Sequence, residues 1–154
     1  MSPLTNCIKN KDTKTNPIWL MRQAGRYLPE FRQIRSQNPN FFKLCFNSEL
    51  ATEITLQPLK RFNLDAAIVF SDILVIPFAL RQPIEFRKEG GPWNPNFNLN
   101  ELLETKENFF LSTLSPVYKT IKKTKQKLEK NKSLIAFIGA PWTLMIYLYN
   151  LKNQ

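Results

Sequence analysis

The sequence predicts an α/β fold built on a parallel sheet, and three observations carry that prediction. Residues 65–70 (DAAIVF) and 133–139 (SLIAFIG) are mainly apolar runs of strand length, as expected of strands buried on both faces. A helical segment lies between them, so the order is that of a βαβ unit. The chain has 154 residues, too few for a complete (β/α)8 barrel, which takes about 250, and two such strands neither close a barrel nor make a typical stand-alone sheet.

The segments before the first strand are predicted to be mainly helical. Residues 1–16 are polar, and we expect a mobile N-terminus that becomes ordered at Pro17. Pro29 at a first-turn position predicts a helix over 29–36. Ser48 is a suitable N-cap for a further helix that ends near residue 62 and is kinked or restarted at Pro58.

Between and after the two strands, the pattern predicts a loop and two helices. Residues 81–100 are rich in Pro, Gly and Asn, with residues 84–86 as a possible short strand inside a loop. Ser115 as N-cap and Pro116 at the first helical position predict a helix that ends near residue 131. Residues 140–145 are expected to turn from a loop into a helix.

Composition excludes several kinds of chemistry. The chain has 22 Lys+Arg, 12 Asp+Glu and no histidine, giving a net charge of +10. Without histidine there is no imidazole acid–base chemistry and no Ser-His or Cys-His nucleophile. Cys7 and Cys45 form neither a disulfide framework nor a zinc site. No secretory signal is visible, and the apolar runs 66–80 and 134–149 fall short of the roughly 20 residues of a membrane span, so we expect a cytoplasmic protein without membrane segments.

Four arginines gather near the N-terminus, at Arg22, Arg26, Arg32 and Arg35. Guanidinium groups bind carboxylates and phosphates through two parallel hydrogen bonds. A ligand with several acidic groups would also offset the repulsion between Arg22 and Arg26, which are four residues apart. The alternative is an exposed basic helix whose arginines are solvated.

A second group of candidate residues follows the two strands. Asp72 leaves the first strand at its carboxyl end, the edge where α/β folds place ligand-binding residues. Its alternative role is a helix N-cap or a loop anchor. After the second strand, Trp142, Tyr147 and Tyr149 could line a pocket for a flat apolar ligand, the alternative being core packing.

The lysine-rich segment 119–132 is interpreted as the solvated face of a packed helix. A basic nucleic-acid-binding module remains the alternative, and it would show steep salt dependence of binding. The sequence contains no Walker loop, no GxGxxG motif and no metal-ligand cluster.

Three segments, read together, resemble the uroporphyrinogen decarboxylase family. They are PIWLMRQAGRYLPEFRQIR at 17–35, TLQPLKRFNLDAAIVFSDILVIPFAL at 55–80 and FIGAPWTLMIYLY at 137–149. They come in the family's order and spacing, and with the weaker segments between them they cover residues 16–149. Related barrels that act as corrinoid methyltransferases use His and Cys metal ligands that are missing here, and RQAGR at 22–26 favours the decarboxylase.

The resemblance implies a (β/α)8 barrel that needs no cofactor or metal and is typically homodimeric. It would remove CO2 from the four acetate side chains of uroporphyrinogen, giving coproporphyrinogen in haem synthesis. The resemblance assigns catalytic roles to Asp72, Arg22 and Arg26. It assigns substrate binding to Arg22, the main chain of Ala24, Arg26, Arg35, Asp72 and Tyr147.

The sequence also departs from the family pattern. The later strands that supply a serine and a histidine are absent, and Arg81 stands where members commonly have glycine. We therefore expect residues 17–154 to be the N-terminal portion of such a barrel, inactive or nearly so alone. It could come from a truncated product, an incomplete sequence, or a split gene whose C-terminal half is encoded separately.

Overall fold

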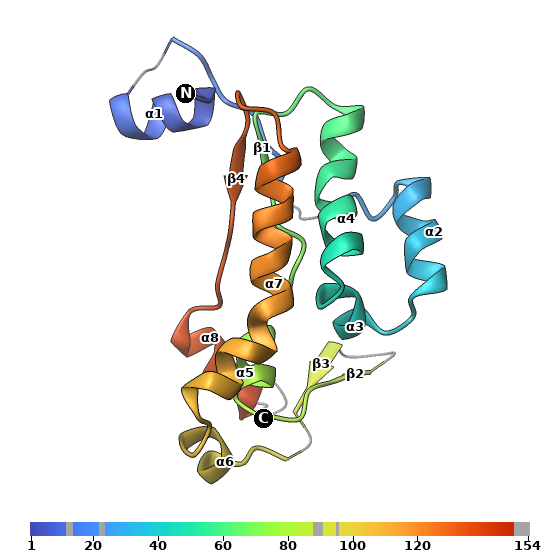
Figure 1. Ribbon diagram of the computed structural model, residues 1–154, viewed down its shortest axis with the longest axis vertical. Coiled ribbons are helices and arrows are strands. Elements are labelled where there is room, and N and C mark those ends of the chain that lie inside the picture. The colour runs from blue at the N-terminus through green and yellow to red at the C-terminus, as the bar shows by residue number, and fades with distance from the viewer. Residues whose placement is uncertain (12–13, 22–23, 88–90, 95, 150–154) are drawn as a thin grey trace. The chain divides into compact units, whose positions relative to one another are not determined.

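The computed structural model describes residues 1–11, 14–21, 24–87, 91–94 and 96–149. Its helices and strands are shown in Figure 1 and follow in chain order: α1 (Pro3–Asn10), α2 (Pro29–Gln37), α3 (Phe41–Cys45), α4 (Ser48–Arg61), β1 (Ala66–Ile68), α5 (Val75–Ala79), β2 (Glu85–Arg87), β3 (Gly91–Trp93), α6 (Leu99–Leu103), α7 (Glu107–Lys127), β4 (Ser133–Ile135) and α8 (Pro141–Leu148).

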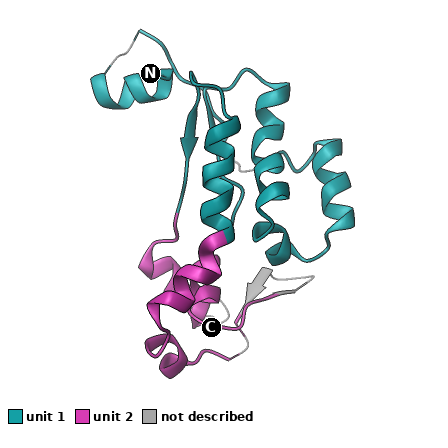
Figure 2. Cartoon of the chain, viewed as in Figure 1, with its two compact units in different colours: residues 1–71, 116–137 teal, residues 72–115, 138–154 magenta. Residues whose placement is uncertain are grey.

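The chain forms two compact units that are interleaved along the sequence (Figure 2). The first comprises residues 1–71 and 116–137, and the second comprises residues 72–115 and 138–154. Because each unit is built from two separate stretches of chain, no single boundary divides the sequence into consecutive domains.

The first unit contains the predicted parallel strand pair. β1 and β4 run parallel, with Ala66 opposite Ser133 and Ile68 opposite Ile135, which confirms the expected βαβ arrangement. Both strands are shorter than the apolar runs that predicted them. Burial on both faces is wrong for β4, whose residues are only half-buried, because the described chain does not cover that strand as fully as β1.

Helices α2, α3 and α4 enclose the core of the first unit. The start of α2 at Pro29 is confirmed, with the proline at the first helical position. Phe70, just beyond β1, packs edge-on against the rings of Phe31 and Phe41, at centroid distances of 6.4 and 5.7 Å. Further buried members of this core are Ala24, Leu28, Ile34, Leu44, Cys45, Ala51 and Ile54.

Helix α4 differs from its prediction at both positions that we singled out. Its N-cap is Asn47 and not Ser48, because the Asn47 side chain accepts hydrogen bonds from the backbone N–H groups of Glu49 and Leu50. The helix continues through Pro58 to Arg61 without restarting. Tertiary packing overrides the local cost of the proline here, since Pro58 is buried.

Helix α1 lies within the polar segment 1–16, where the sequence indicated no helix. The Ser2 side chain accepts a hydrogen bond from Thr5 N–H, and Pro3 occupies the first helical turn. The hydroxyls of Ser2 and Thr5 also reach Ser133 Oγ, at 2.5 and 3.2 Å. This polar cap and the contact with the start of β4 stabilise a helix that hydrophobic patterning alone does not indicate.

Helix α7 begins already at Glu107, so the predicted start at Ser115 and Pro116 is wrong. Pro116 lies inside the helix. The buried face of the helix includes Leu114, Thr120, Thr124 and the following Leu128. The Thr52 hydroxyl of α4 donates a hydrogen bond of 3.5 Å to the Thr120 carbonyl, which joins α4 to α7 in the first unit.

The second unit is built from short elements. Helix α5 lies between β1 and the segment 81–100 that was expected to be a loop, and α6 begins at the end of that segment. β2 and β3 pair antiparallel, confirming a short strand at the predicted place, and α8 confirms the helix expected after residue 140. Among the described residues, no helix has both the length and the hydropathy that crossing a bilayer requires.

Candidate active site

Residues 24–28, here called the arginine turn, form a tight backbone turn in the first unit. Leu28 N–H donates to the Gly25 carbonyl at 2.8 Å, and Arg26 N–H donates to the Ala24 carbonyl at 3.1 Å. A Cβ added at Gly25 would lie 2.5 Å from Leu28 Cδ1. Since Leu28 is buried in the core, there is no room for a larger residue at Gly25.

The turn borders a cavity of about 430 Å³ in the first unit. Arg26 is exposed there, and its guanidinium forms no hydrogen bond or ion pair with any residue that the structure describes. A free guanidinium beside an apolar hollow is suited to bind a carboxylate through paired hydrogen bonds. The lining residues are Leu20, Ala24, Gly25, Arg26, Tyr27, Leu28 and Pro58.

The other arginines of the cluster have different surroundings. Arg22 lies outside the described residues. Arg35 Nη1 donates a 2.5 Å hydrogen bond to the Asn38 carbonyl, and its guanidinium carbon is 5.9 Å from the centroid of the Phe41 ring. Arg35 therefore already closes the carboxyl end of α2. Arg32 is exposed on the same helix.

Asp72 follows β1 and begins the second unit. Its carboxylate Oδ1 accepts a 2.8 Å hydrogen bond from Leu74 N–H. The N-cap of α5 is Leu74, so Asp72 anchors the turn that precedes the helix. Burial raises the pKa of Asp72, and the hydrogen bond from Leu74 opposes that rise only in part.

No described cation contributes to the pKa of Asp72. A partly buried carboxyl group with a raised pKa and no ion pair to a described residue is unusual, and such groups are concentrated at functional sites. The geometry therefore combines the loop-anchoring role of Asp72 with the properties of a candidate catalytic carboxyl.

The segment that follows β4 packs against the segment that follows β1 within the second unit. A Cβ added at Gly139 would lie 3.1 Å from Ile73 Cβ, so the chain beside Asp72 and the turn before α8 are in close contact. This agrees with the expectation that the carboxyl ends of the two strands share one edge. Tyr147 is half-buried on α8.

The aromatic residues expected to line a pocket do not do so in either cavity described here. Trp142 and Tyr149 are exposed, and the Tyr149 ring lies 4.5 Å from the ring of Phe97, between centroids. The core-packing alternative is also wrong for Trp142, because its side chain is largely in solvent.

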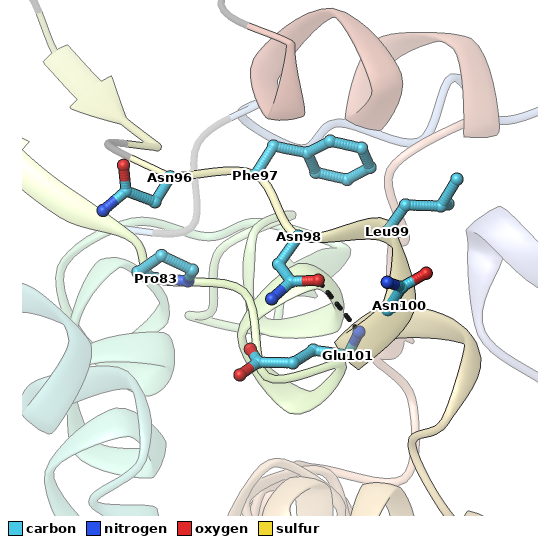
Figure 3. Close-up of a pocket in the computed structure, with 7 residues that line it drawn as sticks. All are labelled: Pro83, Asn96, Phe97, Asn98, Leu99, Asn100 and Glu101. Atoms are coloured by element: carbon cyan, nitrogen blue, oxygen red, sulfur yellow. Dashed lines mark hydrogen bonds between the residues drawn. The ribbon is translucent and has the colours of Figure 1, made fainter.

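A second cavity, of about 450 Å³, lies in the second unit, where no site was predicted (Figure 3). Asn98 accepts a hydrogen bond from Glu101 N–H at 3.2 Å, the dashed line in the figure. The only charged lining group is the Glu101 carboxylate, which would repel an anionic ligand. Its lining is Pro83, Asn96, Phe97, Asn98, Leu99, Asn100 and Glu101, so this cavity does not suit a polycarboxylate.

The candidate residues divide between the two units. Ala24, Arg26 and Arg35 belong to the first, and Asp72 and Tyr147 to the second. Sequence reasoning missed the apolar walls of the first cavity. The only available signal was that Leu20 precedes the arginine turn in an apolar run.

Comparison with known proteins supplies the deciding observation. The family model described as "Uroporphyrinogen decarboxylase (URO-D)" matches residues 1–153. The chain belongs to the uroporphyrinogen decarboxylase family. This family has the TIM-barrel fold, and the α/β chain with its two-stranded parallel sheet is consistent with part of such a barrel.

Relatives named uroporphyrinogen decarboxylase are similar over most of this chain. The protein from Chelativorans sp. (strain BNC1) is 49% identical over 86% of the chain and 39% of its own length. The proteins from Rickettsia bellii and Agrobacterium fabrum are 44% and 45% identical over 100% and 92% of the chain. The chain spans 45% and 41% of their lengths, so it corresponds to less than half of each of these uroporphyrinogen decarboxylases.

Proposed function

We propose that this chain supplies part of the active site of a uroporphyrinogen decarboxylase. The reaction is loss of CO2 from the four acetate side chains of uroporphyrinogen, giving coproporphyrinogen. The observation that carries the proposal is the exposed guanidinium of Arg26, which has no partner among the described residues and lines the cavity beside the arginine turn. A substrate with eight carboxylates is the kind of ligand that such a cation would bind.

In this proposal the arginines orient the substrate through its carboxylates. Arg22 and Arg26 bind acidic side chains, and the main chain at Ala24 adds a polar contact. Arg35 joins them by exchanging its hydrogen bond to the Asn38 carbonyl for one to a substrate carboxylate. Tyr147 provides a further contact with the substrate from α8.

The proposed chemistry needs no group outside the substrate to accept electrons. Protonation of a pyrrole ring makes the ring cationic, and the electrons of the breaking C–C bond then flow into that ring as CO2 leaves. A second proton adds to the exocyclic carbon, while the ring proton is released. Each acetate thus exchanges CO2 for one proton and becomes a methyl group.

Asp72 is the proposed partner of the pyrrole nitrogens. Its carboxylate accepts hydrogen bonds from pyrrole N–H groups and stabilises the positive charge that develops on the ring. Because that charge is largest on the way to CO2 loss, the interaction favours the transition state over the bound substrate. Burial of Asp72, which raises its pKa in the structure, would strengthen this electrostatic interaction.

We further propose that residues 17–154 form the N-terminal portion of a (β/α)8 barrel that is incomplete in this chain. The half-buried state of β4 and the share of each relative that is covered support it. The isolated 154-residue chain is accordingly expected to be inactive or nearly so.

The test compares the chain alone with a fusion to the part of the Rickettsia bellii relative that the match does not cover. Incubated anaerobically with uroporphyrinogen, the chain alone should give no coproporphyrinogen above the blank, and the fusion should give it. In the fusion, Asp72→Asn and Arg26→Ala should each lower kcat/KM at least about a hundredfold. Lys43→Ala, which removes an exposed cation on α3, serves as the matched control.

Two outcomes would contradict the proposal. An inactive but folded fusion would remove the decarboxylase assignment, and turnover by the chain alone would remove the claim that it is inactive. Equal losses from Lys43→Ala and Arg26→Ala would show that general positive charge, and not the arginine turn, binds the substrate.

A further inference from the structure

Thr55, on helix α4, carries a hydroxyl group that is enclosed within the first unit. The residue is 1% exposed. Its hydroxyl donates a hydrogen bond of 2.7 Å to the Ala51 carbonyl, one turn earlier in the helix, and accepts one of 2.9 Å from Phe70 N–H. Because the bond to Ala51 uses the hydrogen of the hydroxyl, a lone pair of its oxygen is left to accept the Phe70 N–H.

The bond to Phe70 lies where the chain leaves the parallel sheet. Val69 N–H still donates to the Ile135 carbonyl of β4, at 2.9 Å. The following amide, that of Phe70, donates to Thr55 instead. Since a buried N–H group without an acceptor costs free energy, the Thr55 hydroxyl completes the hydrogen bonding of the chain just beyond the carboxyl end of β1.

Phe70 is therefore held in two ways within the first unit. Its ring packs edge-on against the rings of Phe31 and Phe41, and its amide is bonded to Thr55. Ring packing is only weakly directional, whereas a hydrogen bond of normal length also fixes the direction of the N–H group. The Thr55 hydroxyl thus sets the direction in which the backbone leaves the strand.

Asp72 follows Phe70 after a single intervening residue. That residue, Ser71, is itself buried. Asp72 Oδ1 then accepts the hydrogen bond from Leu74 N–H, at 2.8 Å. A catalytic group has to be held within about 0.5 Å of its productive position by the bonds around it, and the bond at Phe70 is close enough along the chain to contribute to that.

We propose that Thr55 is a positioning residue for Asp72, which its hydroxyl holds in place through the Phe70 backbone. The inference rests on the proposed function, in which Asp72 stabilises charge on the pyrrole ring, and it adds a residue that does not touch the substrate. In that function Asp72 acts mainly in the transition state, while the arginines bind the carboxylates. Loss of the Thr55 hydroxyl should therefore lower kcat and leave KM nearly unchanged.

The first test measures the steady-state kinetics of the fusion described above. Thr55→Val replaces the hydroxyl by a methyl group of similar size, and it should lower kcat at least about tenfold with KM changed less than about twofold. Thr55→Ser keeps the hydroxyl and should retain kcat within about threefold of the unchanged fusion.

Thr52→Val is the matched control for the loss of a buried hydroxyl. Thr52 is also 1% exposed and lies on the same helix. Its hydroxyl bonds to the Ser48 and Thr120 carbonyls, so it has no bond to the chain that leads to Asp72. Thr52→Val should leave kcat unchanged, and equal losses of kcat from Thr52→Val and Thr55→Val would overturn the proposal.

A double variant separates positioning from a general loss of structure. When Thr55 acts through Asp72, adding Thr55→Val to Asp72→Asn lowers kcat no further, because the interaction that the hydroxyl supports is already gone. A further loss as large as the one that Thr55→Val causes in the unchanged fusion would overturn the proposal.

Hydrogen exchange in the 154-residue chain gives a readout that needs no activity. The Leu74 amide reports on the position of Asp72, because it donates to the Oδ1 atom of that residue. Thr55→Val should speed up the exchange of Leu74 N–H at least about fivefold, whereas Thr52→Val should leave it unchanged. An unchanged exchange rate in Thr55→Val would overturn the proposal, even when that variant lowers kcat.

The two measurements distinguish this inference from the proposed function. An Asp72→Asn fusion with undiminished kcat would overturn the catalytic role of Asp72, and the exchange of Leu74 N–H would still decide whether Thr55 positions that residue. A fusion that loses activity with Asp72→Asn but keeps it with Thr55→Val would retain the proposed function and overturn the inference.

Discussion

Two hydrogen bonds join Asp65 to Ile18. The Asp65 carboxylate Oδ2 accepts from Ile18 N–H at 2.7 Å, and Asp65 N–H donates to the Ile18 carbonyl at 2.7 Å. The Asp65 carbonyl also accepts from Ser133 N–H at 2.9 Å. One residue at the start of β1 thus fixes both the second strand and the segment that leads to the arginine turn.

Replacing Asp65 by alanine should destabilise the first unit. Asp65→Ala leaves Ile18 N–H without its acceptor, at an expected cost of about 1 kcal/mol. Asp65→Asn keeps a side-chain oxygen at the same position and should lower the free energy of unfolding clearly less. Urea unfolding followed by circular dichroism measures both. An equal loss in the two variants would mean that the negative charge matters, and not the hydrogen bond.

A methyl group at Gly25 should also be costly. The alanine Cβ would lie 2.5 and 2.6 Å from Leu28 Cδ1 and Cγ, so Gly25→Ala forces Leu28 to move within the core, at about 1–3 kcal/mol. The double variant with Leu28→Ala should be more stable than the sum of the two single losses predicts. Additive losses in urea unfolding would exclude this clash.

Two buried glutamines provide a matched pair. Gln57 is 2% exposed and neither side-chain polar atom has a hydrogen-bond partner within the described parts of the chain. Gln82 is 1% exposed, and its amide bonds to the Leu80 and Asn98 carbonyls and to Asn98 N–H.

Because an unsatisfied buried amide costs free energy, Gln57→Met should raise the unfolding free energy by about 1 kcal/mol. Gln82→Met removes satisfied hydrogen bonds and should lower it by about 2 kcal/mol. Thermal and urea unfolding give both values. If Gln57→Met instead lowers the unfolding free energy as much as Gln82→Met does, the Gln57 amide has a hydrogen-bond partner in solution.

Asp72 should make stability depend on pH in a defined direction. Its pKa is raised in the folded chain because of burial, so the folded state binds the proton more tightly than the unfolded state. Stability therefore falls as pH rises from the ordinary aspartate pKa through the raised value, and the loss persists at neutral pH. Asp72→Asn should be more stable than the unchanged chain at neutral pH and equally stable in acid, as urea titrations at both pH values can show.

Arg81 occupies a left-handed backbone conformation, with φ of 59°, and its guanidinium carbon lies 4.4 Å from the Phe109 ring centroid. Arg81→Ala and Arg81→Gly both remove that contact, but only glycine adopts this conformation without strain. The free energy of unfolding should therefore be about 0.5–1 kcal/mol higher for Arg81→Gly than for Arg81→Ala. Equal values would mean that the backbone relaxes when the side chain is removed.

The features predictable from sequence are those that hydrophobic patterning controls. The apolar runs located β1 and β4 and their parallel pairing, because strands of parallel sheets have nearly continuous apolar residues, although β4 is only half-buried in the described chain. Pro29 located the start of α2 for a local reason, since its ring favours the first helical turn.

The missed helices share a physical cause, which is a short polar cap. Asn40, Asn47 and Asn98 each accept backbone N–H bonds at the start of a helix, although asparagine is equally common in turns. Helices α3 and α6 were therefore missed. Pro58 and Pro116 both lie inside helices, and the burial of Pro58 offsets its local cost in a way that the sequence does not reveal.

For the candidate site, sequence placed Asp72 at a strand end and Arg26 in a turn. The cavity beside Arg26 also depends on Pro58, which comes from a distant part of the chain and carries no chemical signature. The partnering of Arg35 by the Asn38 carbonyl likewise depends on how α2 ends, which only the structure describes.

The pairing of β1 with β4 also determines when this chain can fold during its synthesis. Ser2 meets Ser133, 131 residues later, and β1 gains its neighbour only once β4 has been made. Parallel pairing between strands that are far apart in the sequence forms slowly, and strand edges that are still unpaired can associate with other chains. Until residue 135 has left the ribosome, α1 and β1 cannot form their contacts with β4. The yield of folded protein in the cell should therefore depend on chaperones that shield nascent strands.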